Sequence, residues 1–306
     1  METSRRPSRP ALLSIFAAAL AVPAAALPAA RFLPLPGYAP AAVDLRMSDR
    51  GAFPSTEAEI GESRDPLAAL GADENLRDSL NSLSPAEALK IGLRDASVAN
   101  RLSAVRAAAF PRDVAAVPPL AGLMLRIDQP ARLRAAAALA LGLIGDRVAV
   151  PSLAEALKDP SPNVRFSAAL SLGRLPADGV ATRLERTLRT DPQWGPRYAA
   201  AIALGRTHKA FVADALIEAL MSDPAWQVRQ QAARSLQELG TARAADALIA
   251  ALNDPEPTVR AAAGAALAEI GGADQRLAVA QALRRESDPS VRAVLAAAQR
   301  RAHARS

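Results

Sequence analysis

Apolar residues between positions 95 and 300 recur with the three-to-four-residue period of an amphipathic α-helix. One set of apolar runs follows an arginine and closes on Gly or Pro, as at 134–146, 165–176 and 260–271. A second set closes on an aspartate, as at 150–159, 212–223 and 245–254. No stretch alternates with a period of two over the length of a strand. The pattern therefore predicts an all-α chain built from pairs of helices.

A polar signature marks the same point of each predicted helix pair, because an Asp is followed six residues later by an Arg. The pairs are Asp95/Arg101, Asp128/Arg134, Asp159/Arg165, Asp191/Arg197, Asp223/Arg229 and Asp254/Arg260, and Arg292 continues the series with a shortened loop after Asp288. Successive arginines are 31 to 33 residues apart. Such a period predicts an α-solenoid, a stack of helical hairpins that bury their apolar faces only against one another.

Prolines and glycines place the helix ends. Pro162 and Pro257 each lie three residues after an Asp, where they fit only before or inside a first helical turn. The first helix of each pair is therefore expected to start three to five residues after its Asp. The Gly that closes the run is expected to end the helix with a positive φ.

The repeated residues resemble HEAT-like repeats of the short type found in phycobilisome lyases. The resemblance rests on the pattern D-P-x-x-x-V-R-x-x-A-A-x-A-L-G-x-I-G, best kept at 254–271 and 159–175, and it covers roughly residues 95–300. It implies a ladder of hydrogen bonds, formed by these Asp and Arg residues between neighbouring repeats. The step is shorter than the 40–47 residues of standard HEAT repeats.

Elementary electrostatics favours the same ladder. Arg offers a planar fork of donors and Asp a two-oxygen acceptor, and a partly buried charge needs its partner close by. The alternative is a row of arginines that binds an anionic polymer. An acid accompanies the base in almost every repeat, and this favours the structural interpretation.

The first residues have the layout of a secretory signal. Arg5, Arg6 and Arg9 precede the apolar run 11–22, and small residues follow at 22–30. The sequence predicts a signal peptide at 1–26 and an exported protein, periplasmic or secreted, with no membrane span in the mature chain. An uncleaved anchor is the alternative. Without cysteine, export implies no disulfides.

The segment between the signal and the repeats is divided in two. Residues 27–65 are rich in Pro, Gly and Ser and predict a disordered linker. Residues 66–94 predict N-terminal capping helices, because Ser84-Pro85-Ala86-Glu87 is a capping box with Pro at the first helical position. The repeat array then occupies 95–306 and ends in a basic helix.

Composition and charge indicate which residues form the core and which ligands the surface favours. Aromatic residues make up 3% of the chain, so the core must be Ala and Leu. The net charge is +6, with an excess of Arg at 284, 285, 300, 301 and 305 that is either a solvated helix or a contact for an anion or membrane surface. The predicted second helices carry acids as well as arginines, so nucleic-acid binding is not expected.

Candidate chemistry is scarce. The chain has two histidines, His208 and His303, and no cysteine, so we expect no metal site, cofactor or catalytic residue. The interpretation is a non-catalytic scaffold that binds another protein. Two alternatives stay open: a bilin-lyase-like enzyme or accessory subunit, as the resemblance implies, and a nucleic-acid-binding solenoid.

The few aromatic residues suggest where a partner could bind. Trp194 and Trp226 each lie three residues after the Asp of adjacent repeats, and Tyr198 lies one helical turn after Trp194. Phe166 is equivalent to Tyr198 one repeat earlier. These four residues are either packing groups at the helix entry or an aromatic ridge for a partner.

Overall fold

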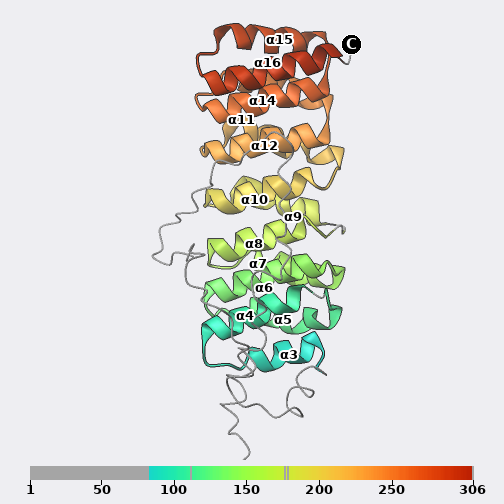
Figure 1. Cartoon of the computed structure of the whole chain (residues 1–306), viewed down its shortest axis with the longest axis vertical. Coiled ribbons are helices and arrows are strands. Elements are labelled where there is room, and N and C mark those ends of the chain that lie inside the picture. Colours follow the sequence, from blue (N-terminus) through green and yellow to red (C-terminus); the bar gives the residue numbers. More distant parts are fainter. Residues whose placement is uncertain (1–82, 111, 176, 178, 305–306) are drawn as a thin grey trace, which may run out of the picture. The chain divides into compact units, whose positions relative to one another are not determined.

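Helices are the only regular elements in the part of the chain that the computed structural model describes, residues 83–304 without 111, 176 and 178 (Figure 1). The predicted all-α class is confirmed. The predicted signal peptide, the linker and residues 66–82 of the predicted cap lie outside the described residues. The chain divides into two compact units, residues 1–107 and 108–306, with the boundary inside α4 (Val98–Ala109).

In the first unit, α3 (Pro85–Gly92) begins with the predicted capping box. The Ser84 hydroxyl accepts from the Glu87 amide at 3.3 Å, and the Glu87 carboxylate accepts from the Ser84 amide at 2.9 Å. Helices α3 and α4 approach closely, since a Cβ at Gly92 would lie 2.5 Å from that of Ala104.

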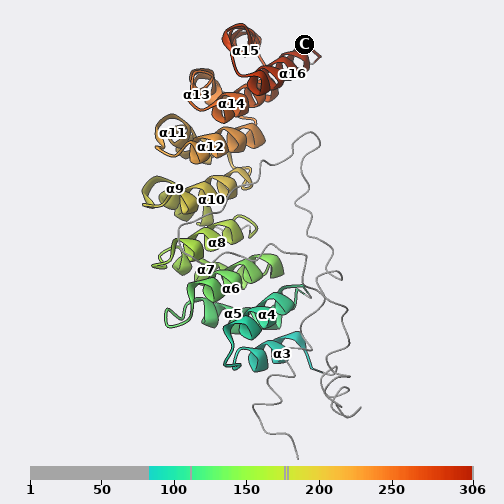
Figure 2. The ribbon, with the colours of Figure 1, turned by 60° about the vertical axis from the view of Figure 1, so that its left-hand side comes forward.

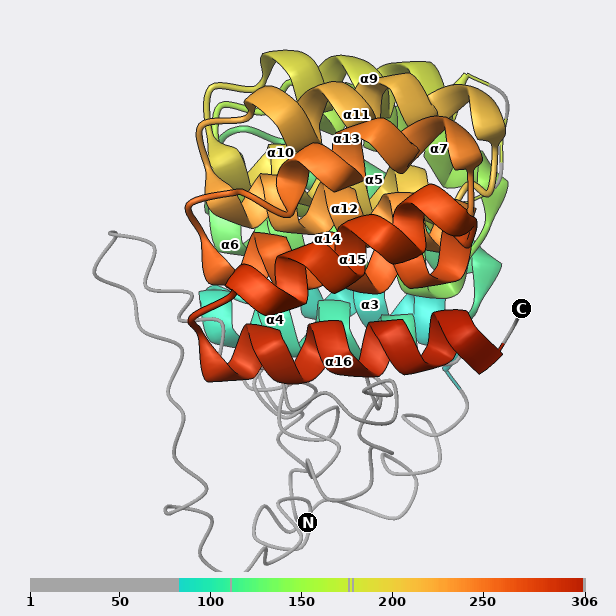
Figure 3. The same cartoon turned by 90° about the horizontal axis from the view of Figure 1, so that it is seen from above.

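In the second unit the helices form two layers, visible as two rows in Figure 2. The first-helix layer contains α6 (Ala131–Ile144), α8 (Pro162–Leu172), α10 (Trp194–Gly205), α12 (Trp226–Leu239), α14 (Pro257–Ile270) and α16 (Pro289–Ala304). The second-helix layer contains α5 (Val117–Met124), α7 (Val150–Ala156), α9 (Val180–Thr190), α11 (Ala213–Ser222), α13 (Ala245–Ala251) and α15 (Ala273–Arg285). Each first helix packs against the next first helix and against the second helix that precedes it in the chain, as α12 does against α14 and α11. Seen from above, α15 and α16 lie side by side (Figure 3).

Each first helix starts three residues after the acid of its repeat, as Trp194 does after Asp191. The carboxylate itself organises this turn: Asp191 accepts from the Gln193 amide at 3.0 Å, and Asp223 accepts from the Ala225 amide at 2.9 Å. Such a side-chain bond satisfies an amide that the helix start would otherwise leave unpaired.

The glycines at the helix ends serve two different purposes. Gly145 (φ 84°) and Gly240 (φ 60°) end α6 and α12 in the left-handed conformation, as predicted. The same prediction is wrong for Gly205, which still belongs to α10, and Gly173, for which no such ending was predicted, is right-handed. At both positions a Cβ would meet the next repeat within 2.7 Å, so the glycine is needed for close packing.

Small polar residues tie neighbouring first helices together. The buried Ser171 hydroxyl donates to the Ala138 carbonyl at 2.8 Å, and the buried Ser235 hydroxyl donates to the Ala201 carbonyl at 2.8 Å. Each bond joins one repeat to the repeat before it. The rest of the core is mainly Ala and Leu, as expected from composition.

Short 3-10 turns precede several second helices and were not predicted. They are η2 (Val114–Ala116), η3 (Arg147–Ala149), η4 (Ala210–Val212) and η5 (Ala242–Ala244). Their third residue is fully buried in every case, so the turn anchors the loop to the core.

Candidate interaction surface

The repeated arginines and acids form a ladder that runs from one repeat to the next. Arg197 donates through Nε and Nη2 to both carboxylate oxygens of Asp223, each at 2.8 Å, and through Nη1 to the backbone carbonyl of Asp191 at 2.9 Å. Each such arginine thus joins the turn of its own repeat to the acid of the following repeat. The six-residue spacing of Asp191 and Arg197 in the sequence corresponds to the hydrogen bond from Arg197 to the Asp191 backbone carbonyl. The ion pair instead joins Arg197 to Asp223, 26 residues later in the next repeat.

The complete ladder consists of the pairs Arg134–Asp159, Arg165–Asp191, Arg197–Asp223, Arg229–Asp254 and Arg260–Glu286. The arginine side chains are 5% exposed at Arg134 and 17% exposed at Arg260, so the ladder is most buried at its N-terminal end. The hydrogen bonds to Asp223 and Asp254 raise the pKa of Arg197 and Arg229 above the usual value of an arginine. A row of arginines occupied in this way is structural.

Two predicted ladder residues have other partners. Asp128 is exposed, and its carboxylate pairs with Arg126 at 2.7 Å and accepts from Gln129 at 3.0 Å. Asp95 accepts from the Ser97 amide at 2.7 Å and from Asn100 at 3.2 Å. Asp128 therefore belongs to a local surface pair, and the ladder of the second unit begins at Arg134.

Arg101 makes the backbone hydrogen bonds of a ladder arginine but no ion pair to a following repeat among the described residues. Its Nη1 donates to the backbone carbonyls of Asp95 at 2.6 Å and Ala96 at 3.1 Å. Its Nε is buried without a hydrogen-bond partner among the described residues.

The last acid of the ladder is Glu286, which the repeated Asp-to-Arg pattern did not indicate. Asp288 was expected to be the acid of the last repeat, with a shortened loop, but Arg260 binds both oxygens of Glu286 at 2.7 and 2.8 Å. Glu286 lies six residues before Arg292, so the normal spacing is kept with Glu in place of Asp. Arg292 is exposed and makes no ladder pair, because no further repeat follows it among the described residues.

The Arg260–Glu286 pair is expected to make the free energy of unfolding depend on pH. The bond from Arg260 lowers the pKa of Glu286 from 4.5 to about 2. Because the folded pKa is lower than the unfolded one, the stabilisation is fully present above about pH 4.5 and is lost as the pH falls through about 2. Glu286→Gln should lower the free energy of unfolding at pH 7 by about 2 kcal/mol, after allowance for solvent screening at the partly exposed Arg260.

Denaturant titrations of both proteins at pH 7 and near pH 3 test this prediction. The difference between wild type and variant should shrink at the lower pH. A difference that is the same at both pH values would contradict the assigned pKa. The parallel variant Asp288→Asn keeps the ladder and should not show the same pH dependence.

The outward face of the first-helix layer carries an apolar strip across α6, α8, α10 and α12. Its residues lie three before, one after or five after the ladder arginine of their helix, positions that are one turn apart on a single face. We define the apolar strip as Leu139, Phe166, Leu170, Trp194, Tyr198, Ile202 and Trp226. Leu139 is 41% exposed and Trp226 is 39% exposed, and the other five are half-buried.

The predicted aromatic residues all belong to this strip. Trp194 and Tyr198 pack edge to face, with ring centroids 6.2 Å apart and an interplanar angle of 79°. Phe166 and Trp226 lie on the flanking helices α8 and α12. All four keep solvent-accessible surface, which a purely internal packing group would not.

Two arginines border the strip, one just beyond the end of α8 and one just beyond the end of α10. We call Arg174 and Arg206 the arginine pair. Both are exposed, and neither side chain makes a hydrogen bond or ion pair with the described residues. Loss of part of its hydration, followed by the charges of Arg206 and Arg112, lowers the pKa of Arg174. In the same row on α12, burial raises the pKa of Glu238.

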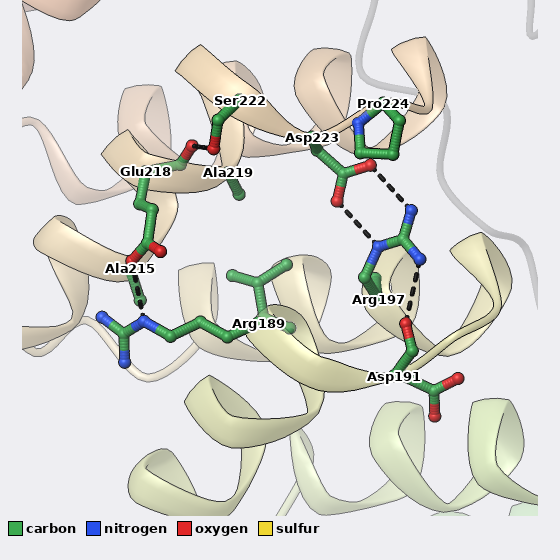
Figure 4. A pocket seen from close by; sticks show the side chains of 10 residues that line it. Arg189, Asp191, Arg197, Ala215, Glu218, Ala219, Ser222, Asp223 and Pro224 are labelled. Carbon is green, nitrogen blue, oxygen red and sulfur yellow. Dashed lines mark hydrogen bonds and ion pairs between the residues drawn. The ribbon is translucent and has the colours of Figure 1, made fainter.

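A hollow of about 220 Å³ opens between α9 and α11, beside the Arg197–Asp223 pair (Figure 4). Arg189 bridges it by an ion pair of 2.8 Å to Glu218. The charged side chains Arg189 and Glu218, and likewise Arg197 and Asp223, are thus already paired. We interpret the hollow as a packing gap between neighbouring repeats.

The described part of the chain contains no candidate metal cluster and no candidate membrane span. No group of His, Asp and Glu side chains there could hold a metal ion. None of the described helices combines the length and apolarity that a membrane crossing requires.

Comparisons agree with the repeat architecture. Residues 122–205 and 213–299, more than half of the chain, match the family model of HEAT repeats. The chain therefore belongs to the HEAT-repeat family, and the predicted HEAT-like resemblance is confirmed. A search of curated proteins gives no match.

Several solved structures are similar at low identity. Human deoxyhypusine hydroxylase in complex with glycerol is 22% identical over 78% of this chain and 99% of its own, with a TM-score of 0.37. The complex of CpcE and CpcF of phycocyanin lyase from Nostoc sp. is 22% identical over 82% and 100%, with a TM-score of 0.46. An engineered protein is 19% identical over 72% and 98%, with a TM-score of 0.42. At such identities the likeness concerns the fold alone.

Proposed function

We propose that this HEAT-repeat chain is a non-catalytic scaffold that binds another protein through the apolar strip. The observation that carries the proposal is the outward placement of large apolar side chains on four neighbouring helices. Such contiguous surface is costly to leave in water, and in monomeric proteins it commonly marks an interaction site. Aromatic residues are also the side chains that most often dominate binding energy.

The second-helix layer favours this proposal over nucleic-acid binding. Acids lie among its cations, and several cations in or beside its helices are paired, as Arg189 is with Glu218, Arg243 with Asp214 and Lys158 with Glu155. A surface on which acids interrupt the cations has no continuous basic track, so it releases fewer counterions on contact with a polyanion than a basic surface does. A catalytic role has no specific observation in its favour.

Trp194→Ala tests the proposal. The chain and its variant are used to capture proteins from the native cells, and the captured partner is then purified for affinity measurements. Trp194→Ala should weaken binding about fivefold or more, which corresponds to more than ~1 kcal/mol, with little change in melting temperature. Trp226→Ala should act in the same direction.

Leu277→Ala is the matched control, because Leu277 is 55% exposed on α15, outside the strip. Affinity should be unchanged in this variant. If Trp194→Ala lowers the melting temperature and leaves affinity intact, the tryptophan is a packing group and the proposal is wrong.

We also propose that the chain is exported. The support is the sequence: a basic start, the short apolar run 11–22 and small residues after it. The mature protein should begin near Leu27, within about four residues. N-terminal sequencing of protein from the periplasm or medium measures this, and Met1 retained on a cytoplasmic product would refute it.

A further inference from the structure

The surface around the apolar strip changes in character across its width. Equivalent positions on α8 and α10 and just beyond their ends form three rows, each four residues from the previous one. The rows are Phe166 with Tyr198, then Leu170 with Ile202, then Arg174 with Arg206. The surface therefore passes from aromatic to aliphatic to basic, and its basic edge is the arginine pair.

The charge of the arginine pair is compensated less than the ladder charges are, because only Glu238, one repeat further along the same row, interacts with the charge of Arg206, and it forms no ion pair with it among the described residues. The Arg197 guanidinium binds a carboxylate through two nitrogens, whereas Arg174 and Arg206 have no ion pair with the described residues. Arg174 lies near the positive charges of Arg206 and Arg112. A carboxylate brought to this edge would relieve the repulsion and form charge-assisted hydrogen bonds.

The dimensions of the strip suit a helix. It crosses the four first helices from α6 to α12, and neighbouring packed helices lie ~8–10 Å apart, so its length is about 25–30 Å. A helix of about 18 residues has this length. A peptide that binds by adding a β-strand would need a free sheet edge, and the described helices offer none. A polyanion would gain nothing from the aliphatic row.

We propose that the strip and the arginine pair bind an amphipathic helix of another protein, with apolar side chains on the strip and Asp or Glu side chains against Arg174 and Arg206. This inference rests on the proposed function and specifies its partner. The apolar anchors would recur at positions i, i+3 or i+4, and i+7, the spacing of helices that lie in apolar grooves. The carboxylates would lie along one flank of that helix.

A display library of 18-residue helical peptides with randomised outward positions provides the probe. Selection on the full chain should enrich peptides with an apolar stripe flanked by Asp or Glu. Enriched sequences are then synthesised with a fluorescent label, and their affinity is measured by anisotropy. Enrichment of neutral or basic peptides, or of none, would overturn the inference.

A charge reversal tests the role of the arginine pair directly. The double variant Arg174→Glu/Arg206→Glu should weaken the enriched peptides about tenfold or more. Peptides with Lys in place of their acids should bind this variant better than the wild type. The matched control Arg300→Glu/Arg301→Glu reverses two exposed arginines on α16 and should leave affinity within about twofold.

The outcomes separate the inference from the proposed function. If Trp194→Ala abolishes peptide binding and the charge reversal does not weaken it, the strip binds helices but the acidic partner is wrong. If neither change matters, both proposals fail. Competition by single-stranded oligonucleotides or anionic vesicles that requires Arg174 and Arg206 would identify a polyanion as the ligand and overturn the inference.

Discussion

Replacing Arg197 by Ala is expected to lower the free energy of unfolding by about 3–5 kcal/mol. The change leaves the Asp223 carboxylate, whose side chain is 5% exposed, without its two charged hydrogen bonds. It also frees the Asp191 backbone carbonyl that Nη1 holds. Removing one partner of a buried ion pair is costly because the other charge stays desolvated.

Chemical denaturation monitored by circular dichroism measures the effect. Arg292→Ala is the matched control, because Arg292 occupies the same repeat position but is exposed and makes no ladder pair. It should shift stability by less than about 0.5 kcal/mol. Equal losses at both sites would show that the ladder does not carry the stability assigned to it.

A double-mutant cycle separates the pair from its surroundings. Asp223→Ala leaves Arg197 as the unpaired charge, and the combined change removes both partners. The double variant should lose less stability than the sum of the two single variants, because no buried charge is left alone. Strict additivity would argue against a direct interaction.

Gly142→Ala is expected to lower stability by about 2–3 kcal/mol, although Ala is the better helix former. A Cβ at position 142 would lie 2.5 Å from the Ser171 hydroxyl and 2.8 Å from the Ser171 Cα. Helices α6 and α8 would have to move apart, and the bond from Ser171 to the Ala138 carbonyl would be strained. In a linear array such a change weakens one interface between repeats and leaves the other interfaces intact.

Gly122→Ala supplies the control inside a helix with free space. No atom lies within 4 Å of a Cβ at Gly122, so the substitution should be neutral or stabilise α5 by up to ~1 kcal/mol. Thermal unfolding of the two variants should therefore move in opposite directions. A stabilised Gly142→Ala would mean that the two helices can separate at little cost.

The amino-acid sequence by itself determined the repeat, the helix class and the start of each first helix. These features follow from local physics: helical periodicity, proline geometry and the capping box at Ser84 are each encoded within a few residues. The equivalence of Trp194 and Trp226 was also readable, because a constant period aligns residues without knowledge of the packing.

Tertiary structure alone decided how the repeats are joined. The sequence places Arg197 six residues from Asp191, yet its carboxylate partner is Asp223, 26 residues away, because stacking brings the next turn beside it. Glu286 takes the last acid position for the same reason, since Arg260 reaches whichever carboxylate the next repeat presents. Pairing across an interface depends on the stacking of neighbours, which is not local to either segment.

The same distinction applies to the glycines and to the candidate site. Gly145 ends a helix, which its sequence context predicts. Position 205, by contrast, has no room for a side chain, because Ser235 of the next repeat packs against it. The apolar strip and the arginine pair likewise become one surface only when α8 and α10 lie side by side. Solvent exposure is a property of the assembled layers, and it could not be read from the spacing of aromatic residues.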